Sequence, residues 1–83
     1  MRIEWQPRAL KEFERLDTRT RARVSAALDR LVEDGHGDVT KLVDVRPPEY
    51  RLRVGGLRVR FARDDAAGVL IVLRLVPRGE AYR

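Results

Sequence analysis

The residues of this sequence that could do chemistry gather in one short stretch, residues 50–61, which reads YRLRVGGLRVRF. It contains Arg51, Arg53, Arg58 and Arg60, each of them next to an aliphatic or aromatic residue. Arginine stays charged in essentially any protein setting, and its planar guanidinium binds phosphate or carboxylate through paired hydrogen bonds. The stretch therefore predicts a surface for an anionic partner, with a solvated basic face as the simpler alternative.

Other catalytic chemistries find little support in the composition. The chain has no cysteine, which excludes disulfides, thiolate catalysis and cysteine-ligated zinc. Its one histidine, His36, lies between two glycines, where a role in a turn is a simpler interpretation than acid–base catalysis. We therefore expect no metal site and no cofactor.

The net charge of +5 is concentrated in the second half of the chain. Residues 1–45 contain nine Lys and Arg and nine Asp and Glu, whereas residues 46–63 contain six arginines and one glutamate. Only two lysines occur in the chain, so a general preference for arginine contributes to this pattern. A clustered basic surface is typical of proteins that bind nucleic acid, an acidic protein segment or a membrane surface.

Length and composition indicate one folded domain, residues 1–83. The chain is 43% hydrophobic and 37% charged, which is typical of a folded soluble domain and not of a disordered tail. No apolar run approaches the roughly 20 residues of a membrane helix, and the N-terminus lacks the apolar core of a signal peptide. We therefore expect a cytoplasmic protein without a membrane partner.

The first half of the chain predicts a strand followed by an antiparallel pair of helices. Apolar residues alternate over residues 1–5, which predicts a strand, and Pro7 suits the first position of a helix. Asp17 or Thr18 can cap a second helix, and Gly35 ends it. The apolar residues at helical spacing are Leu10, Phe13 and Leu16 in the first helix and Val24, Leu28, Leu31 and Val32 in the second.

The arginine-rich stretch predicts a β-hairpin whose turn is Gly55-Gly56. Apolar residues alternate with arginines on both sides of this turn, and residues that flank a two-residue turn pair outward in steps of one. All four arginines then share one face, and the large apolar residues share the other. The expected cross-strand pairs are Val54 with Leu57, Arg53 with Arg58, Leu52 with Val59, and Arg51 with Arg60. Directly opposed like charges cost up to about 1 kcal/mol per pair, and a bound anion would remove that cost.

The remaining segments complete the expected sheet. We assign residues 35–48 to a loop, because the two prolines at its end exclude a central strand or helix. Residues 64–68 form a second turn, and residues 69–76 are almost all apolar, as in a central strand covered on both faces. Pro77 ends this strand, and residues 78–83 form a C-terminal tail.

This order of elements resembles the RelE/ParE toxin superfamily of bacterial type II toxin–antitoxin modules. The resemblance covers essentially the whole chain, and its most specific parts are Tyr-Arg-Leu-Arg-Val-Gly, then Arg-Val-Arg-Phe, and the tail LVPRGEAYR. Pro77 departs from the family tail, which has His or Lys there. The resemblance implies an α+β fold with an N-terminal strand, a two-helix hairpin, and a twisted, mainly antiparallel sheet of about four strands with the helices packed on one face.

The resemblance also implies site residues. RelE-like members are ribosome-dependent endoribonucleases that cut mRNA without a metal, by attack of the 2′-hydroxyl on the adjacent phosphorus. ParE-like members act on DNA gyrase and typically lack the set of residues that the RelE-like members use. This sequence matches that set at Arg51, Arg58, Arg78 and Tyr82, which we expect to be catalytic. Further arginines are expected to bind RNA phosphates: Arg53, Arg60, Arg63 and Arg74.

The sequence contains more than one candidate for the group that accepts the proton of the 2′-hydroxyl. Arg51 and Arg53 stand where the best-known RelE proteins carry lysine, and arginine does not give up its proton. Tyr82 is the expected base, because neighbouring cations favour a phenolate. Glu80 and the ribosome itself are the alternatives.

The expected partners are a cognate antitoxin, the ribosome and mRNA. The antitoxin should place an acidic or amphipathic C-terminal segment on the arginines, in a toxin–antitoxin hetero-oligomer. Two other functions share the fold: a ParE-like or otherwise non-nucleolytic toxin, and a non-enzymatic module whose arginine face receives only a protein segment.

Overall fold

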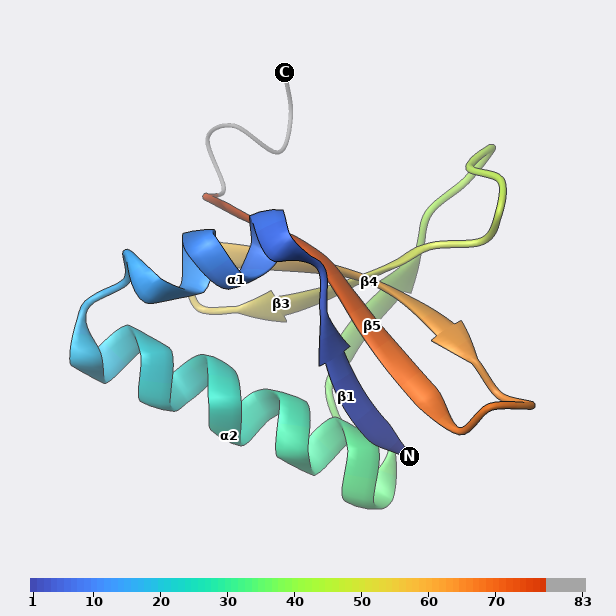
Figure 1. Cartoon of the computed structure of the whole chain (residues 1–83), viewed down its shortest axis with the longest axis horizontal. Helices are drawn as coiled ribbons and strands as arrows, with labels where there is room; N and C mark the ends of the chain where they lie inside the picture. Colours follow the sequence, from blue (N-terminus) through green and yellow to red (C-terminus); the bar gives the residue numbers. More distant parts are fainter. Residues whose placement is uncertain (78–83) are drawn as a thin grey trace.

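The computed structural model describes residues 1–77, which form a mixed five-stranded sheet with two helices on one face (Figure 1). The sheet order is β1-β5-β4-β3-β2, and only the pair of β1 with β5 is parallel. The strands are β1 (Arg2–Trp5), β2 (Asp38–Lys41), β3 (Tyr50–Val54), β4 (Leu57–Asp64) and β5 (Val69–Pro77).

The start of each helix and the end of the second helix lie where the sequence places their signals. Helix α1 (Pro7–Glu14) has Pro7 in its first turn, where the missing N–H costs nothing. Helix α2 (Thr18–Asp34) is capped by Asp17, whose side chain accepts a hydrogen bond of 3.3 Å from the Thr20 N–H. Gly35 ends α2 in the left-handed conformation, with a φ of 76°. The predicted helical pair is confirmed, but α1 is shorter than expected, because it ends before Leu16, and Leu10 is exposed.

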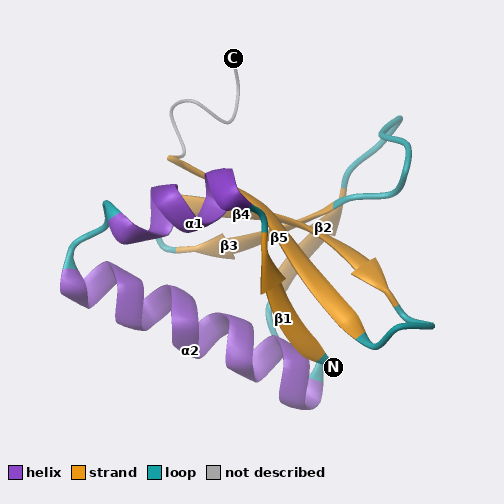
Figure 2. Ribbon diagram, viewed as in Figure 1, coloured by secondary structure: helices purple, strands orange, loops and turns teal. Residues whose placement is uncertain are grey.

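The hydrophobic core lies between the helices and the sheet (Figure 2). Ala9, Val24 and Leu28 are its fully buried helix residues. Trp5 and Phe13 contact each other at the edge of the core, with ring centroids 4.8 Å apart. The buried sheet residues of the core are Leu52, Val59, Phe61, Leu70, Val72 and Leu75.

The predicted fold class is confirmed, but the sheet has five strands where about four were expected. The additional strand is β2, which lies inside the segment that the sequence analysis assigned to a loop. All four of its residues are exposed at the sheet edge. A strand without a buried face has no alternation of apolar and polar residues, so its sequence carries little signal.

The arginine-rich hairpin has the predicted register, with Arg53 opposite Arg58 and Arg51 opposite Arg60. One irregularity interrupts the next ladder: Arg60 pairs with Arg74, whereas Phe61 pairs with Val72. Leu73 is therefore an extra residue in β5, a β-bulge that changes which way the following side chains point. Beyond the bulge, Arg74 shares a sheet face with Arg60.

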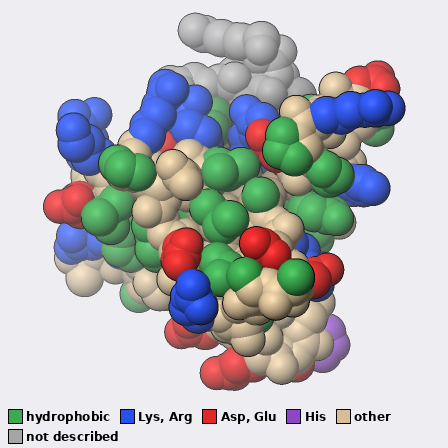
Figure 3. Space-filling model, turned by 45° about the vertical axis from the view of Figure 1, so that its right-hand side comes forward, with side chains coloured by type: hydrophobic (Ala, Val, Ile, Leu, Met, Phe, Trp, Pro, Cys, Tyr) green, Lys and Arg blue, Asp and Glu red, His purple; other side chains and the backbone are tan. Residues whose placement is uncertain are grey.

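The surface seen in Figure 3 has hydrophobic side chains across its centre and charged side chains around them. The exposed large apolar residues of the described part of the chain are Met1, Leu10, Val39 and Val43. No helix within residues 1–77 is long and apolar enough to span a membrane.

Candidate functional site

The sheet face turned away from the helices carries a block of arginines, which we call the arginine face: Arg51, Arg53, Arg58, Arg60 and Arg74. Residues paired across antiparallel strands project to the same face, and neighbours along a strand project to opposite faces. Leu52 and Val59 lie in the core against the helices, so the arginines beside them point to the other side of the sheet. The predicted segregation of charge is confirmed for the hairpin.

Register places these residues in two rows across the sheet. One row runs from Asp38 in β2 through Arg53 and Arg58 to Val76 in β5. The other runs from Thr40 in β2 through Arg51, Arg60 and Arg74. Four neighbouring strands thus contribute to one surface.

Arg58 is the most unusual member of the arginine face, because it is only 3% exposed. Its Nη1 donates to the carbonyl oxygens of Leu57 at 3.2 Å and of Gly55 at 3.4 Å. Within residues 1–77 it forms no ion pair with a carboxylate. A buried charge is costly unless an opposite charge accompanies it, and arginine does not escape the cost by losing its proton. The site is therefore suited to an external anion.

A small cavity is lined by residues of both rows, at the end where β2, β3 and β4 contribute to them. Its volume is about 110 Å³, and a water molecule takes about 30 Å³ of the liquid, so an anion of a few heavy atoms fits in it. The residues that line it are Asp38, Thr40, Arg51, Arg53 and Arg58. We call this cavity the arginine pocket. Three guanidinium groups around a phosphate-sized space can bind a phosphoryl group through charge-assisted hydrogen bonds.

Two members of the arginine face, Arg60 and Arg74, have acidic partners within residues 1–77. Arg60 donates to the carboxylate of Glu49, the residue before β3, although its buried Nε has no hydrogen-bond partner within residues 1–77. Arg74 binds both carboxylate oxygens of Glu12 in α1, at 3.0 and 3.1 Å. These two arginines lie beside the arginine pocket, but each is largely neutralised within the fold.

The Glu12 carboxylate joins α1 to the end of β5. Besides Arg74, it accepts the backbone N–H of Leu75 at 3.0 Å, beyond the point where β1 stops pairing with β5. Burial raises the pKa of Glu12, but the hydrogen bonds from Arg74 and Leu75 and the positive charges of Arg74 and Arg8 outweigh it, so the pKa is lowered overall. Glu12 is thus held ionised at the strand end that precedes the C-terminal tail.

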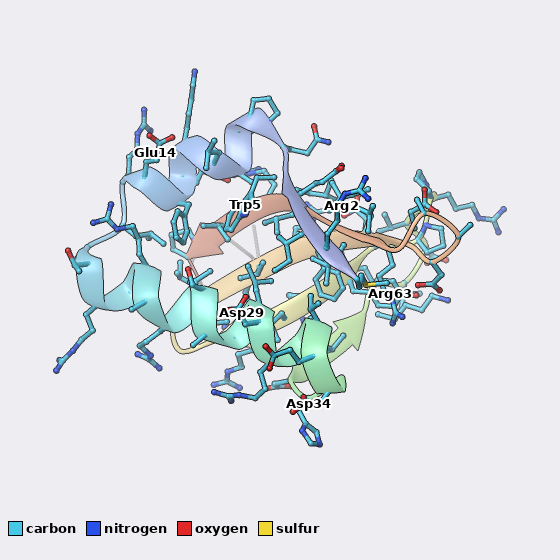
Figure 4. The ribbon with its side chains drawn as sticks, turned by 60° about the horizontal axis from the view of Figure 1, so that its bottom comes forward. Arg2, Trp5, Glu14, Asp29, Asp34 and Arg63 are labelled. Atoms are coloured by element: carbon cyan, nitrogen blue, oxygen red, sulfur yellow. The ribbon has the colours of Figure 1, made fainter. Side chains whose placement is uncertain are left out.

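Of the remaining predicted site residues, one lies away from the arginine pocket and two lie outside the described part of the chain. Arg63 lies on the helix side of β4, near the start of β1 and far from Glu14 of α1 (Figure 4), and it forms an ion pair with Asp65 at 3.2 Å. Arg78 and Tyr82 lie outside the described residues, as does Glu80. The pocket therefore unites Arg51, Arg53 and Arg58 from the expected set.

Sequence reasoning missed two residues of the pocket, Asp38 and Thr40, because it missed the strand that carries them. The β-branched pair Val39 and Thr40 was the only local signal for β2, and it is too short to outweigh the glycines before it. Pairing with β3 explains the position of both missed residues. They face the arginines because they lie directly opposite Arg53 and Arg51.

The same arrangement of a mixed sheet with a helical pair on one face is found in solved structures of bacterial and archaeal RelE toxins. RelE in the RelE–RelB complex from Pyrococcus horikoshii has this fold, with a TM-score of 0.77, 28% identity and coverage of 94% of both chains. RelE of a Methanococcus jannaschii RelB–RelE complex matches with a TM-score of 0.76 and 17% identity, over 95% of this chain and 94% of that one. The isolated Escherichia coli RelE toxin matches with a TM-score of 0.74 and 23% identity, over 96% and 88%.

The chain belongs to the family described as the ParE toxin of the type II toxin–antitoxin system parDE, whose family model matches residues 3–82. A search of curated proteins gives no significant match. The family and the fold together make this chain a toxin of a type II toxin–antitoxin module within the RelE/ParE superfamily. The superfamily resemblance seen in the sequence is confirmed.

Proposed function

We propose that this toxin is a ribosome-dependent mRNA endoribonuclease of the RelE type. The observation that carries the proposal is the arginine pocket, above all the buried Arg58, which has no carboxylate partner within residues 1–77. A surface meant only for solvent contact would not retain a buried cation at such a cost. Because the proposed target is the translating ribosome, the toxin would act in the cytoplasm.

The proposed reaction needs charge stabilisation that the pocket can supply. Attack of the 2′-oxygen on the adjacent phosphorus produces a dianionic, phosphorane-like state, and the 5′-oxygen then leaves. Preorganised cations around the phosphoryl oxygens stabilise that state more than the ground state, which is the source of catalysis. Arg51 and Arg58 take this role, and Arg53, at the exposed rim, guides the RNA backbone.

Two further residues enter the proposal from the RelE resemblance and not from the described structure. Arg78 follows β5 in the sequence and would add a positive charge near the transition state. Tyr82 would stack on a nucleobase of the mRNA or transfer a proton. Glu12 fixes the strand end from which this tail continues, through Arg74 and Leu75.

The antitoxin is the proposed partner that controls the site. The P. horikoshii and M. jannaschii relatives are each solved as a complex of RelE with RelB. For this chain we propose an antitoxin whose acidic segment covers the arginine pocket, so that binding the antitoxin and binding RNA exclude each other.

A gyrase-directed toxin is the second candidate, and the matching family model favours it, because that model describes ParE toxins. The two candidates differ in what they damage. Induction of the toxin in a bacterial host, with mapping of 5′ ends on a translated and an untranslated copy of one mRNA, separates them. Cuts confined to the translated copy support the nuclease, whereas arrest with DNA damage and intact mRNA contradicts it.

Matched variants sharpen this experiment. Arg53→Ala removes an exposed cation of the pocket, and Arg63→Ala removes an exposed cation from the helix side of the same sheet. We expect Arg53→Ala to weaken ribosome binding and to reduce the slope of log affinity against log salt by about one, since one phosphate contact is lost. Because Arg63 lies on the helix side of the sheet, we propose that it does not contact RNA, in contrast to the expectation from the sequence, and Arg63→Ala should bind as the wild type does. Equal losses in both variants would mean that only net charge matters.

A further inference from the structure

Within residues 1–77, Asp38 is the one acidic residue that lines the arginine pocket. It is the first residue of β2, directly opposite Arg53, and Arg58 is the next residue in the same row. It projects to the arginine face, and it is exposed, so a ligand in the pocket can reach its carboxylate. An acid in this position needs an explanation, since it would repel the phosphate that the arginines attract.

Neutralising an arginine is not that explanation. The other carboxylates beside the arginine face are engaged: Glu49 binds Arg60, and Glu12 binds Arg74. Within residues 1–77, Asp38 forms no ion pair with any arginine. Its oxygens therefore remain available to a ligand, whereas those of Glu49 and Glu12 already hold the fold together.

The chemistry of the pocket gives Asp38 a task that none of the other described lining residues can perform. Arg51, Arg53 and Arg58 are permanent cations and accept no proton, and the hydroxyl of Thr40 is a poor base. A carboxylate can take a proton and return it to water. Among the five lining residues, Asp38 is thus the one group fit to remove a proton from a bound hydroxyl.

We infer that Asp38 is the general base that takes the proton of the attacking 2′-hydroxyl, an inference that rests on the proposed nuclease function. The 2′-oxygen forms a bond to phosphorus as its proton moves to the Asp38 carboxylate, and the bond from phosphorus to the 5′-oxygen breaks. Water protonates the departing 5′-oxygen, and Asp38 returns its proton to solvent. The products are a 2′,3′-cyclic phosphate and a 5′-hydroxyl. Asp38 thereby replaces Tyr82 as the base.

The test separates binding from chemistry. Asp38→Asn keeps the size of the side chain, removes its charge and abolishes its capacity as a base. We expect its single-turnover cleavage rate on programmed ribosomes to fall by about 10²- to 10⁴-fold, the usual loss when acid–base catalysis is removed. Its affinity for the same ribosomes should stay equal or increase, because a repulsive charge beside the phosphate is gone. A residue with a merely structural role would weaken both.

Three companion variants complete the design. Asp29→Asn removes an exposed carboxylate from α2, on the other side of the sheet, and should behave as the wild type does (Figure 4). Asp38→Glu restores a carboxylate and should recover part of the rate. If Asp38 is the base, Tyr82→Phe should lose less of the cleavage rate than Asp38→Asn does.

The outcomes are distinguishable. Wild-type cleavage by Asp38→Asn would overturn the inference while leaving the nuclease intact, and so would a parallel loss of binding and rate. A large loss in Tyr82→Phe together with an active Asp38→Asn would return the role to the phenol. A wild-type protein that cleaves no mRNA on ribosomes would overturn both the nuclease and the base.

Discussion

Arg58 is the residue at which the proposed binding site and the stability of the fold conflict most directly. It is almost fully buried, its described partners are two carbonyl oxygens of its own hairpin, and its charge is permanent. Replacing a buried charge by an apolar side chain of similar volume is often neutral or stabilising. Conflict between stability and activity at one residue is typical of functional sites.

We therefore predict that Arg58→Met leaves the free energy of unfolding unchanged or raises it by about 1–4 kcal/mol, while RNA cleavage is lost. Urea denaturation measures the first quantity, and single-turnover cleavage on ribosomes measures the second. Phe61→Ala is the comparison, because it removes a core side chain and should cost about 3–5 kcal/mol. Marked destabilisation by Arg58→Met would mean that the guanidinium supports the fold and is not kept for a ligand.

At the scale of elements, the helices and strands that could be predicted from the sequence are those with alternating or helically spaced apolar residues and recognisable turn residues. The hairpin register followed from Gly55-Gly56 and the alternating arginines, and it is confirmed at every predicted pair. Two features that depend on contacts between distant parts of the chain could not be predicted: the edge strand β2 and the ion pair of Arg74. β2 has no buried face, and the partner of Arg74 depends on a bulge at Leu73 and on a helix 62 residues earlier.

The contact of α1 with β5 predicts a dependence of stability on pH. The pKa of Glu12 is lower in the folded chain than in the unfolded chain, so its contribution is present at pH above the unfolded value and is lost as pH falls through the folded value. At pH 7, Glu12→Ala should cost about 1–3 kcal/mol, since Arg74 and the Leu75 N–H lose their acceptor. Urea denaturation at pH 7 and in acid measures both effects.

Glu14→Ala is the matched control for this prediction, because Glu14 lies in the same helix and is exposed. It should change stability by less than about 0.5 kcal/mol at either pH. If Glu12→Ala and the wild type lose the same free energy of unfolding between pH 7 and acid, the Glu12 carboxylate does not contribute as described.

The geometry of the hairpin turn predicts different stability effects for substitutions at its two glycines. Gly55 has a φ of 58°, and a Cβ there would lie 3.0 Å from a guanidinium nitrogen of Arg23, whereas a Cβ at Gly56 meets nothing within 4 Å. Gly55→Ala should therefore destabilise the fold by about 1–2 kcal/mol, the cost of a left-handed conformation for a residue with a Cβ. Gly56→Ala should have a smaller effect. Thermal denaturation of both variants measures the difference, and equal melting temperatures would contradict this account of the turn.

At the scale of the whole molecule, one face of the sheet packs against the helices to form the core, and the opposite face carries the proposed binding site. The helix side contains the core, and the other side presents the arginines, so an acidic partner can cover the site without disturbing the core. We predict that co-expression of the neighbouring antitoxin gene abolishes toxicity, and that the purified complex no longer binds ribosomes. Growth measurements and ribosome co-sedimentation test this. An antitoxin that rescues growth while the complex still binds ribosomes would contradict a mutually exclusive site.

Cleavage of mRNA by the purified toxin tests the central claim most directly. The measurement compares one mRNA, free in solution and bound in the A site of programmed ribosomes, incubated with the wild type and with Arg58→Met. The arginine pocket predicts cleavage by the wild type on the ribosome, with a 2′,3′-cyclic phosphate and a 5′-hydroxyl at the new ends, and none by Arg58→Met. Intact mRNA on the ribosome with the folded wild-type toxin, or equal cleavage by both proteins, would contradict it.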